Sequence, residues 1–101
     1  MSAFTIPITE AIRSMRLLSF DYKGSTRLVE PHTYGRGGKW DEEMLSAYQI
    51  DGYSGSGNPR GWRCFKIADL ANLRIDSRHF TEPRAGYQAN DGAFRQILAQ
   101  L

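Results

Sequence analysis

The stretch "WRCFK", which begins at Trp62, interleaves cations with aromatic side chains. Successive side chains of an extended strand alternate between its two faces, so Arg63 and Phe65 are expected to share one face. The other face then receives Trp62, Cys64 and Lys66. A guanidinium group beside an aromatic ring can bind a phosphate and stack on a base. The alternative is an arginine at a barrel end, whose aliphatic stem covers apolar surface while its charged head stays in water.

Two segments of the chain, 31–40 and 52–68, carry cations and no acidic residue. Their basic side chains are His32, Arg36, Lys39, Arg60, Arg63 and Lys66. If the fold brings the two segments together, these cations and the aromatic rings between them form a basic patch of the kind that binds phosphate backbones. If the segments stay apart, they are two separate solvated loops. The sequence leaves both arrangements open.

The residue types that most often carry catalysis or bind metals do not form a recognisable pattern. His32 and His79 have no partner at metal-ligand spacing. Cys64 stands alone, and a half-buried small residue on a strand is a simpler interpretation than a nucleophile. The run "YGRGGK" lacks the Gly-Lys-Ser/Thr ending of a phosphate-binding P-loop. We therefore expect no catalytic residue, no metal and no cofactor, and we predict that the chain is not an enzyme.

Composition predicts one small domain over residues 1–101. The chain is 41 % hydrophobic and 24 % charged, which suits a globular core of modest size. The formal net charge is +2, and ten of the 13 cations are arginine. Arginine suits bidentate contacts to phosphate or carboxylate, although a GC-rich genome that favours arginine codons also explains the bias.

The cysteine count and the distribution of apolar residues indicate the cellular compartment of the protein. A single cysteine, Cys64, cannot form an internal disulfide and fits a reducing compartment. The N-terminal "MSAFTIPITEAIRSMR" lacks the apolar run of a signal peptide, and no stretch is long enough to span a bilayer. We therefore expect a cytoplasmic protein that does not contact a membrane.

Local patterns predict an N-terminal helix followed by about five short strands. The apolar stripe of the helix consists of Ile8, Ala11, Ile12 and Met15, and Thr5 is its predicted N-cap. Alternating side chains and turn residues predict strands within 16–22, 26–30, 44–54, 62–67 and 69–77. Short strands joined by turn-rich segments favour a small, strongly bent sheet or barrel.

The C-terminal residues match the pattern of a second helix. The apolar residues that recur at the spacing of one helical face are Phe94, Ile97, Leu98 and Leu101. Asn90 or Asp91 has the side chain of a helix N-cap. We therefore predict a closing helix at about 91–101.

The order of these pieces resembles the WYL domain, a family of bacterial modules named after a Trp-Tyr-Leu run. The stretches that carry the resemblance are "AIRSMRLLSFDYKGSTRLVEPHTYG", "MLSAY" and "WRCFKI", within about residues 8–80. Residues 43–45 (EML) replace the naming triplet, and residues 68–70 (ADL) stand where the family usually has a second basic residue. Family members usually also carry an upstream helix-turn-helix domain, for which the 101 residues leave no room.

The resemblance implies both a fold and a function. WYL domains are Sm-like, SH3-type barrels that sense ligands and regulate transcription or defence systems. We therefore expect a mostly β fold, with N-terminal and C-terminal helices flanking a barrel of about five strands. The ligand that the resemblance implies is a single-stranded nucleic acid or a nucleotide. The candidate ligand-binding residues are Arg63, Lys66, Arg27, His32, Tyr34 and Phe65.

Two other hypotheses remain open at this point. The chain is an oligomeric protein-interaction or assembly subunit if its barrel binds a regulatory protein partner or a second copy of itself, with Trp40 and Tyr53 as interface anchors. It is a small nuclease only if it holds a carboxylate–metal or histidine constellation that the sequence does not reveal. A non-enzymatic binding module for an anionic ligand is the hypothesis that we carry forward.

Overall fold

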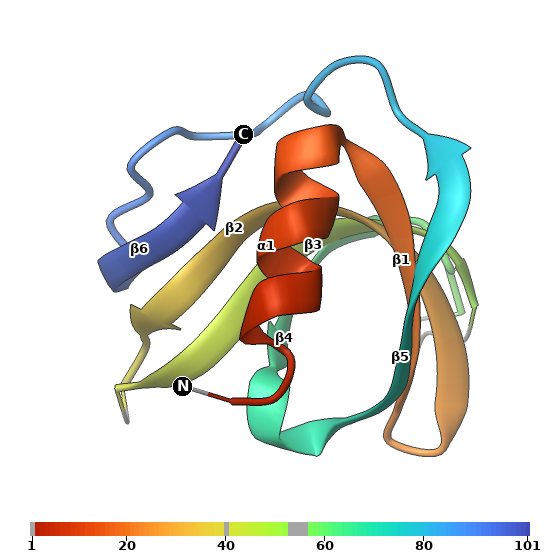
Figure 1. Ribbon diagram of the computed structural model, residues 1–101, viewed down its shortest axis with the longest axis horizontal. Coiled ribbons are helices and arrows are strands. Elements are labelled where there is room, and N and C mark those ends of the chain that lie inside the picture. The colour runs from red at the N-terminus through yellow and green to blue at the C-terminus, as the bar shows by residue number, and fades with distance from the viewer. Residues whose placement is uncertain (1, 40, 53–56) are drawn as a thin grey trace.

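The computed structural model describes residues 2–39, 41–52 and 57–101, which form one helix and six antiparallel strands (Figure 1). In chain order the elements are α1 (Thr5–Ser14), β1 (Arg16–Tyr22), β2 (Ser25–Gly37), β3 (Glu42–Gly52), β4 (Gly61–Lys66), a 3₁₀ turn (Ile67–Asp69), β5 (Leu70–His79) and β6 (Phe94–Gln100). The mostly β fold and the N-terminal helix agree with the prediction from the sequence.

A single bent sheet with the strand order β4-β3-β2-β1-β5 forms the framework. Its central strand is β2, which has 13 residues and pairs with β3 along one edge. Along the other edge, the first half of β2 pairs with β1 and the second half pairs with β6. The β2–β3 register shifts between Pro31 and Thr33, and such irregularities bend a strand. The sheet therefore wraps around a core.

The predicted barrel is not closed. Within the described residues, the sheet ends at β4 on one side and at β5 on the other, and no pairing joins these two strands. β4 has only six residues before the chain turns at Ile67–Asp69, and β5 then pairs along β1. The sheet is thus curved like part of a barrel. Within the described residues β4, β5 and β6 each pair with one other strand and are edge strands.

The core lies between the concave face of this sheet and α1. The predicted stripe of the helix is confirmed for Ile8, Ala11 and Ile12, which are all buried. Its fourth member, Met15, is the C-cap residue beyond the end of the helix and is only partly buried. Across from them, the ring of Phe65 meets the ring of Phe20 edge-on, with centroids 4.9 Å apart. Aromatic and aliphatic side chains thus fill the space between the helix and the sheet.

The two ends of α1 are set by backbone geometry and tertiary contacts. Phe4 occupies the N-cap position without a side-chain cap, so the prediction that Thr5 caps the helix is wrong. The Thr5 hydroxyl instead lies 2.6 Å from the hydroxyl of Tyr34 on β2. At the other end, Met15 adopts a left-handed conformation with φ of 54°, which turns the chain directly into β1.

The predicted C-terminal helix is wrong, because residues 94–100 form β6 along β2 (Figure 1). Gly35 permits this pairing, since a Cβ atom there would collide with the carbonyl oxygen of Gln96. A helix of this length is marginal in isolation. The hydrogen bonds and packing that β2 offers therefore outweigh the helical spacing of the apolar residues.

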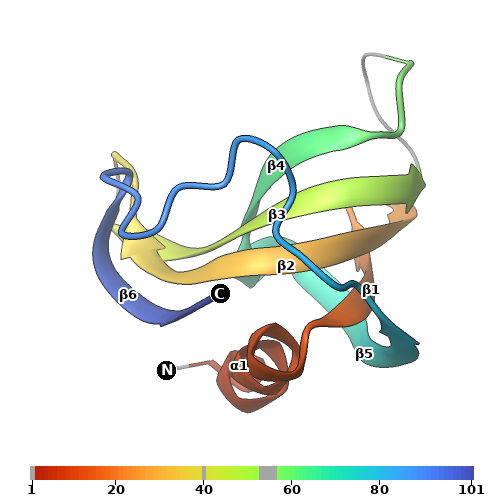
Figure 2. The ribbon, with the colours of Figure 1, turned by 90° about the horizontal axis from the view of Figure 1, so that it is seen from above.

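The two faces of the sheet are covered differently (Figure 2). The helix α1 lies against the concave face, which we call the core face. Residues 80–93 link β5 to β6 by an irregular path across the opposite face. We call this segment the strap and the face beneath it the outer face. Each face carries some of the residues that the sequence singled out.

Candidate functional site

Strand pairing decides which face of β4 each predicted residue occupies. Arg63 lies opposite Ala47, and Phe65 lies opposite Leu45. Because Ala47 and Leu45 are core residues, both β4 side chains point to the core face. Their neighbours in β4 point to the outer face. The predicted alternation is confirmed, and it divides the candidate ligand-binding residues into two groups.

Arg27 belongs to the core-face group. It is only 8 % exposed. Its guanidinium group donates one hydrogen bond to Oε1 of Gln49 at 3.3 Å and another to the carbonyl oxygen of Tyr22 at 3.2 Å. The guanidinium carbon also lies 5.5 Å from the centroid of the Tyr22 ring, within the range of a cation–π interaction. Strand β2 thus holds a cation inside the bent sheet.

Arg63 reaches the same face from the other side of β3. Its guanidinium group donates to the carbonyl oxygens of Trp62 and Asn58, both at 3.0 Å. β3 lies between β2 and β4, and Gln49 of β3 points to the same face as Arg63. Arg27 and Arg63 therefore flank Gln49. The carbonyl and amide oxygens in these bonds carry no net charge, and the bonds orient the two guanidinium groups.

Phe65 and Tyr34 also point to the core face, but both are buried within it. Phe65 packs edge-on against Phe20 and Tyr22, with centroid distances of 4.9 and 5.0 Å. The Tyr34 hydroxyl donates to the carboxylate of Glu43 at 2.5 Å. Burial, together with this bond, raises the pKa of Tyr34. The two rings are therefore parts of the core and do not offer a free face to a base.

Lys66 lies apart from both arginines. It points to the outer face, where its Nζ lies 3.7 Å from a carboxylate oxygen of Glu42. Arg36, from the other acid-free segment, lies 4.0 Å from the carboxylate of Asp41. Exposed ion pairs of this kind are weak and are screened by salt. These two cations are thus paired with acids and are not gathered with Arg63 into one patch.

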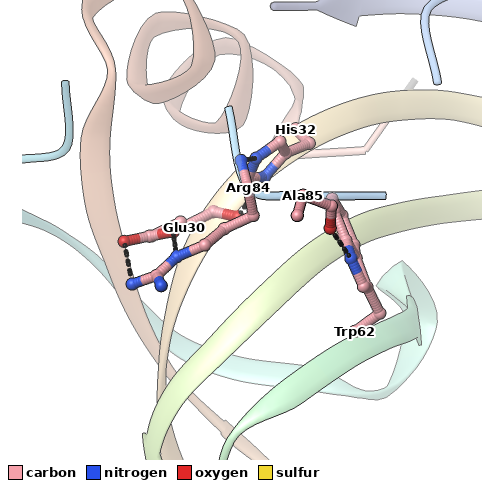
Figure 3. Close-up of polar contacts among 5 residues, drawn as sticks. All are labelled: Glu30, His32, Trp62, Arg84 and Ala85. Carbon is pink, nitrogen blue, oxygen red and sulfur yellow. Dashed lines mark hydrogen bonds and ion pairs between the residues drawn. The ribbon is translucent and has the colours of Figure 1, made fainter. Parts of the chain in front are cut away.

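His32 lies on the outer face and is fully buried (Figure 3). Its Nδ1 lies 2.8 Å from the carbonyl oxygen of Glu30, and its Nε2 accepts a hydrogen bond from the backbone N–H of Arg84 at 3.1 Å. Because a carbonyl oxygen only accepts, Nδ1 carries the proton and the ring is neutral. Burial is the main cause that lowers the pKa of His32 below its usual value.

Three further contacts fasten the strap beside this histidine. Figure 3 draws those of Arg84 with Glu30 and of Trp62 with Ala85. The Nε and Nη2 atoms of Arg84 donate to the two carboxylate oxygens of Glu30, at 2.7 and 3.2 Å. The same guanidinium group lies 4.6 Å from the centroid of the Tyr48 ring. The indole Nε1 of Trp62 donates to the carbonyl oxygen of Ala85 at 2.9 Å. Charge, aromatic and backbone contacts together hold the strap against the sheet.

The sequence analysis did not find the Glu30–Arg84 pair. The two residues are 54 positions apart. Arg84 sits in an irregular segment without hydrophobic periodicity, so no local signal marks it as the partner of a residue on β2. Only the path of the strap across the outer face brings them together.

Within residues 2–39, 41–52 and 57–101, no group of three His, Cys, Asp or Glu side chains could hold a metal ion. Cys64 Sγ lies 3.8 Å from Met44 Sδ, and desolvation raises the pKa of its thiol. A nucleophilic cysteine needs the opposite shift.

The helix α1 has ten residues, and no described helix has the length and apolar character needed to cross a bilayer.

Comparisons with protein-family models, curated proteins and solved structures found no match. The resemblance to the WYL domain therefore rests on the sequence motifs and stays a prediction. The geometry itself defines two separate sets of side chains. One surrounds Gln49 on the core face, and the other lies under the strap on the outer face.

Proposed function

We propose that this chain is a non-enzymatic binding module for an anionic ligand, either a single-stranded nucleic acid or a nucleotide. The observation that supports the proposal most directly is the placement of Arg27 and Arg63. They come from strands on either side of β3 and share one face around Gln49. In the sensing role that the WYL resemblance implies, ligand binding to the module would signal to a regulatory protein partner.

The two guanidinium groups are oriented before a ligand arrives. Carbonyl and amide oxygens hold them in place, so binding removes less side-chain freedom than it would from mobile arginines. A guanidinium group presents its N–H donors in a planar fork that matches the oxygens of a phosphate. Two such groups on one partly desolvated face attract a phosphate more strongly than the same groups in bulk water.

The other predicted residues contribute to the proposal in different ways. Phe65 and Tyr34 are buried, so they act by holding the strands that carry the arginines. His32 is neutral and Lys66 points to the outer face, so neither joins the proposed site. The site therefore centres on Arg27 and Arg63, and contacts to phosphate supply most of its recognition.

The test is a fluorescence-anisotropy titration of a labelled single-stranded oligonucleotide with the full chain, at low and at moderate salt. We expect saturable binding that weakens as salt rises and that is lost in Arg63→Ala. Lys66→Ala is the matched control, because it removes one positive charge from the same strand on the opposite face. This variant should bind like the native chain.

Two results would argue against the nucleic-acid form of the proposal. One is equal loss of binding in both variants, which would indicate general attraction to a basic surface. The other is no binding at low salt by a folded chain. Calorimetric titration with a nucleotide then decides whether a smaller anion binds near Arg63, with the same two variants as probes.

A second candidate function is assembly with a protein partner or with another copy of the chain. β4 and β5 end the sheet, so each has one edge that pairs with no described strand. Free edges can accept a strand from another chain through backbone hydrogen bonds. The predicted anchors Trp40 and Tyr53 lie outside the described residues. A defined oligomer in size-exclusion chromatography with light scattering, without affinity for polyanions, would favour assembly.

A further inference from the structure

A small pocket lies between the strap and the outer face of the sheet. It has a volume of about 200 Å³. Two aromatic rings, two hydroxyl groups, an amide and a carboxylate line it, from Trp62, Tyr87, Thr33, Ser46, Gln88 and Asp91. A cavity needs only about 10–15 Å³ to hold one water molecule, so this pocket is larger than a single water site. It therefore suits a small molecule or the end of a side chain.

The aromatic walls of this pocket are held in place at their polar ends. The indole Nε1 of Trp62 donates to the carbonyl oxygen of Ala85 at 2.9 Å. The hydroxyl of Tyr87 donates to the backbone oxygen of Leu101 at 2.8 Å. The buried ring of His32 contacts both aromatic rings, with centroid distances of 4.7 and 5.4 Å. These contacts fix the orientation of the two rings that line the pocket.

The charge of the lining is negative. Asp91 is the one charged residue that lines the pocket, and its Oδ1 accepts the backbone N–H of Ala93 at 2.9 Å. This bond fixes the carboxylate within a turn of the strap. Arg84, a cation of the same strap, is bound to Glu30. The pocket thus combines fixed aromatic rings with one carboxylate.

We propose that this pocket binds a small organic ammonium group, such as a methylated amine. A cation is attracted to the negative face of an aromatic ring, and tryptophan is the strongest partner. Asp91 supplies the opposite charge and repels anions, while the hydroxyls of Thr33 and Ser46 can accept hydrogen bonds from a polar substituent. This site is separate from the anion-binding site proposed on the core face and prefers ligands of opposite charge.

Gly86 allows the strap to lie close to the aromatic wall. Its φ is +95°, and a Cβ atom there would lie 3.0 Å from Nε1 of Trp62. A larger residue would strain the backbone and press on the indole ring. The glycine therefore lets the strap approach Trp62 while the space beside the ring stays open.

The experiment is a titration of the full chain with choline, followed by the NMR signal of the Trp62 indole N–H at constant ionic strength. Trp40→Phe removes the signal of the second tryptophan of the chain. We expect saturable shifts with choline and much weaker ones with dimethylbutanol, an uncharged carbon analogue of similar shape. Asp91→Asn should weaken choline binding about tenfold, as expected for the loss of a partly desolvated charge contact.

Glu82→Gln is the matched control, because it removes a carboxylate of the same strap that does not line this pocket. It should bind choline like the native chain, and unchanged spectra elsewhere verify that both variants are folded. Trimethyllysine serves as a second probe. Tighter binding of trimethyllysine than of choline would indicate that the natural ligand is a methylated side chain of a protein. Tighter binding of choline would indicate a free small molecule.

Three outcomes overturn the proposal. The first is a choline titration without saturation. The second is equal binding of dimethylbutanol, which would indicate an apolar or hydrogen-bonding pocket without preference for charge. The third is an Asp91→Asn variant that is folded and binds choline as well as the native chain and the Glu82→Gln control.

Discussion

The two faces of the sheet hold their charged groups in different ways. On the core face, Arg27 and Arg63 are oriented by uncharged oxygens. On the outer face, Arg84 is paired with Glu30, and His32 beneath it is neutral. The first arrangement orients two cations on one face of the sheet. The second holds the strap against the sheet through an ion pair and through hydrogen bonds to a neutral histidine.

This difference follows from what covers each face. The helix α1 covers the core face with buried apolar side chains, so the stability of that face depends on packing. The strap is mostly exposed, and a few polar and aromatic contacts hold it. Segments with few buried contacts open at lower free energy than the core. We therefore expect changes on the core face to unfold the whole domain and changes on the outer face to release the strap.

The largest effect is expected from Phe65→Ala. It removes a fully buried ring from the core face and leaves a cavity, which should lower the free energy of unfolding by about 3–5 kcal/mol. Cys64→Ala is the control on the other face of the same strand, with an expected change within about 0.5 kcal/mol. Urea denaturation measures both. Similar losses in the two variants would remove the distinction between the faces.

A smaller and more local effect is expected from Arg84→Ala. The substitution leaves the carboxylate of Glu30, whose side chain is 8 % exposed, without its ion-pair partner. Because the arginine itself is partly exposed, the expected loss is about 1–2 kcal/mol, less than for a fully buried pair. Hydrogen exchange should accelerate at the amides of residue 84 and Tyr87, which donate to His32 and to the carbonyl oxygen of residue 84, before it accelerates in β4.

Arg78→Ala provides the comparison for this variant. Arg78 pairs with Asp76 on the exposed surface of β5, and its loss should leave the strap as protected as in the native chain. Exchange that rises equally in the strap and in β4 after Arg84→Ala would mean that the strap and the core open together. The two faces would then form one cooperative unit.

The smallest effect is a dependence of stability on pH that originates at His32. Its pKa is lower in the folded chain than the usual value of 6.5, so the unfolded chain takes up this proton first as the pH falls. The free energy of unfolding should therefore be highest above pH 6.5 and decrease below it. The slope from this one group is at most about 1.4 kcal/mol per pH unit.

Denaturation of the native chain and of two histidine variants between about pH 7 and pH 5 measures this dependence around the usual histidine pKa. The charged groups that act on His32 are Glu30 and Arg84. His32→Asn should lose the slope. His79→Asn should keep it, since that histidine is exposed at the end of β5. If the slope instead vanishes in His79→Asn, the pH dependence originates at His79 and not at His32.

Local patterns predicted those elements whose form depends on neighbours in the sequence. The helical stripe around Ile8 and the alternation of Arg63 and Phe65 were both correct, because side-chain periodicity follows directly from backbone geometry. The same reasoning failed after Asp91. There the apolar spacing fits a helix, but the free edge of β2 beside Gly35 captures the segment as a strand.

The candidate site was predictable only in part for the same reason. The sequence correctly placed Arg63 on one face of its strand, but it could not show that Arg27 reaches that face across β3. It also could not show that His32 is buried on the opposite face, because a register shift in β2 and the path of the strap place it there. These contacts join residues that are far apart in the chain.

The sequence by itself determined the small β-rich domain, its N-terminal helix and the alternation of its strands, since hydrophobic periodicity acts over a few residues. The tertiary structure decided that the C-terminal segment forms a strand and not a helix. It also decided which face each cation occupies and that Glu30 pairs with Arg84. Those features depend on strand register and on which free edge a segment meets. Both are settled when the whole chain packs around one core.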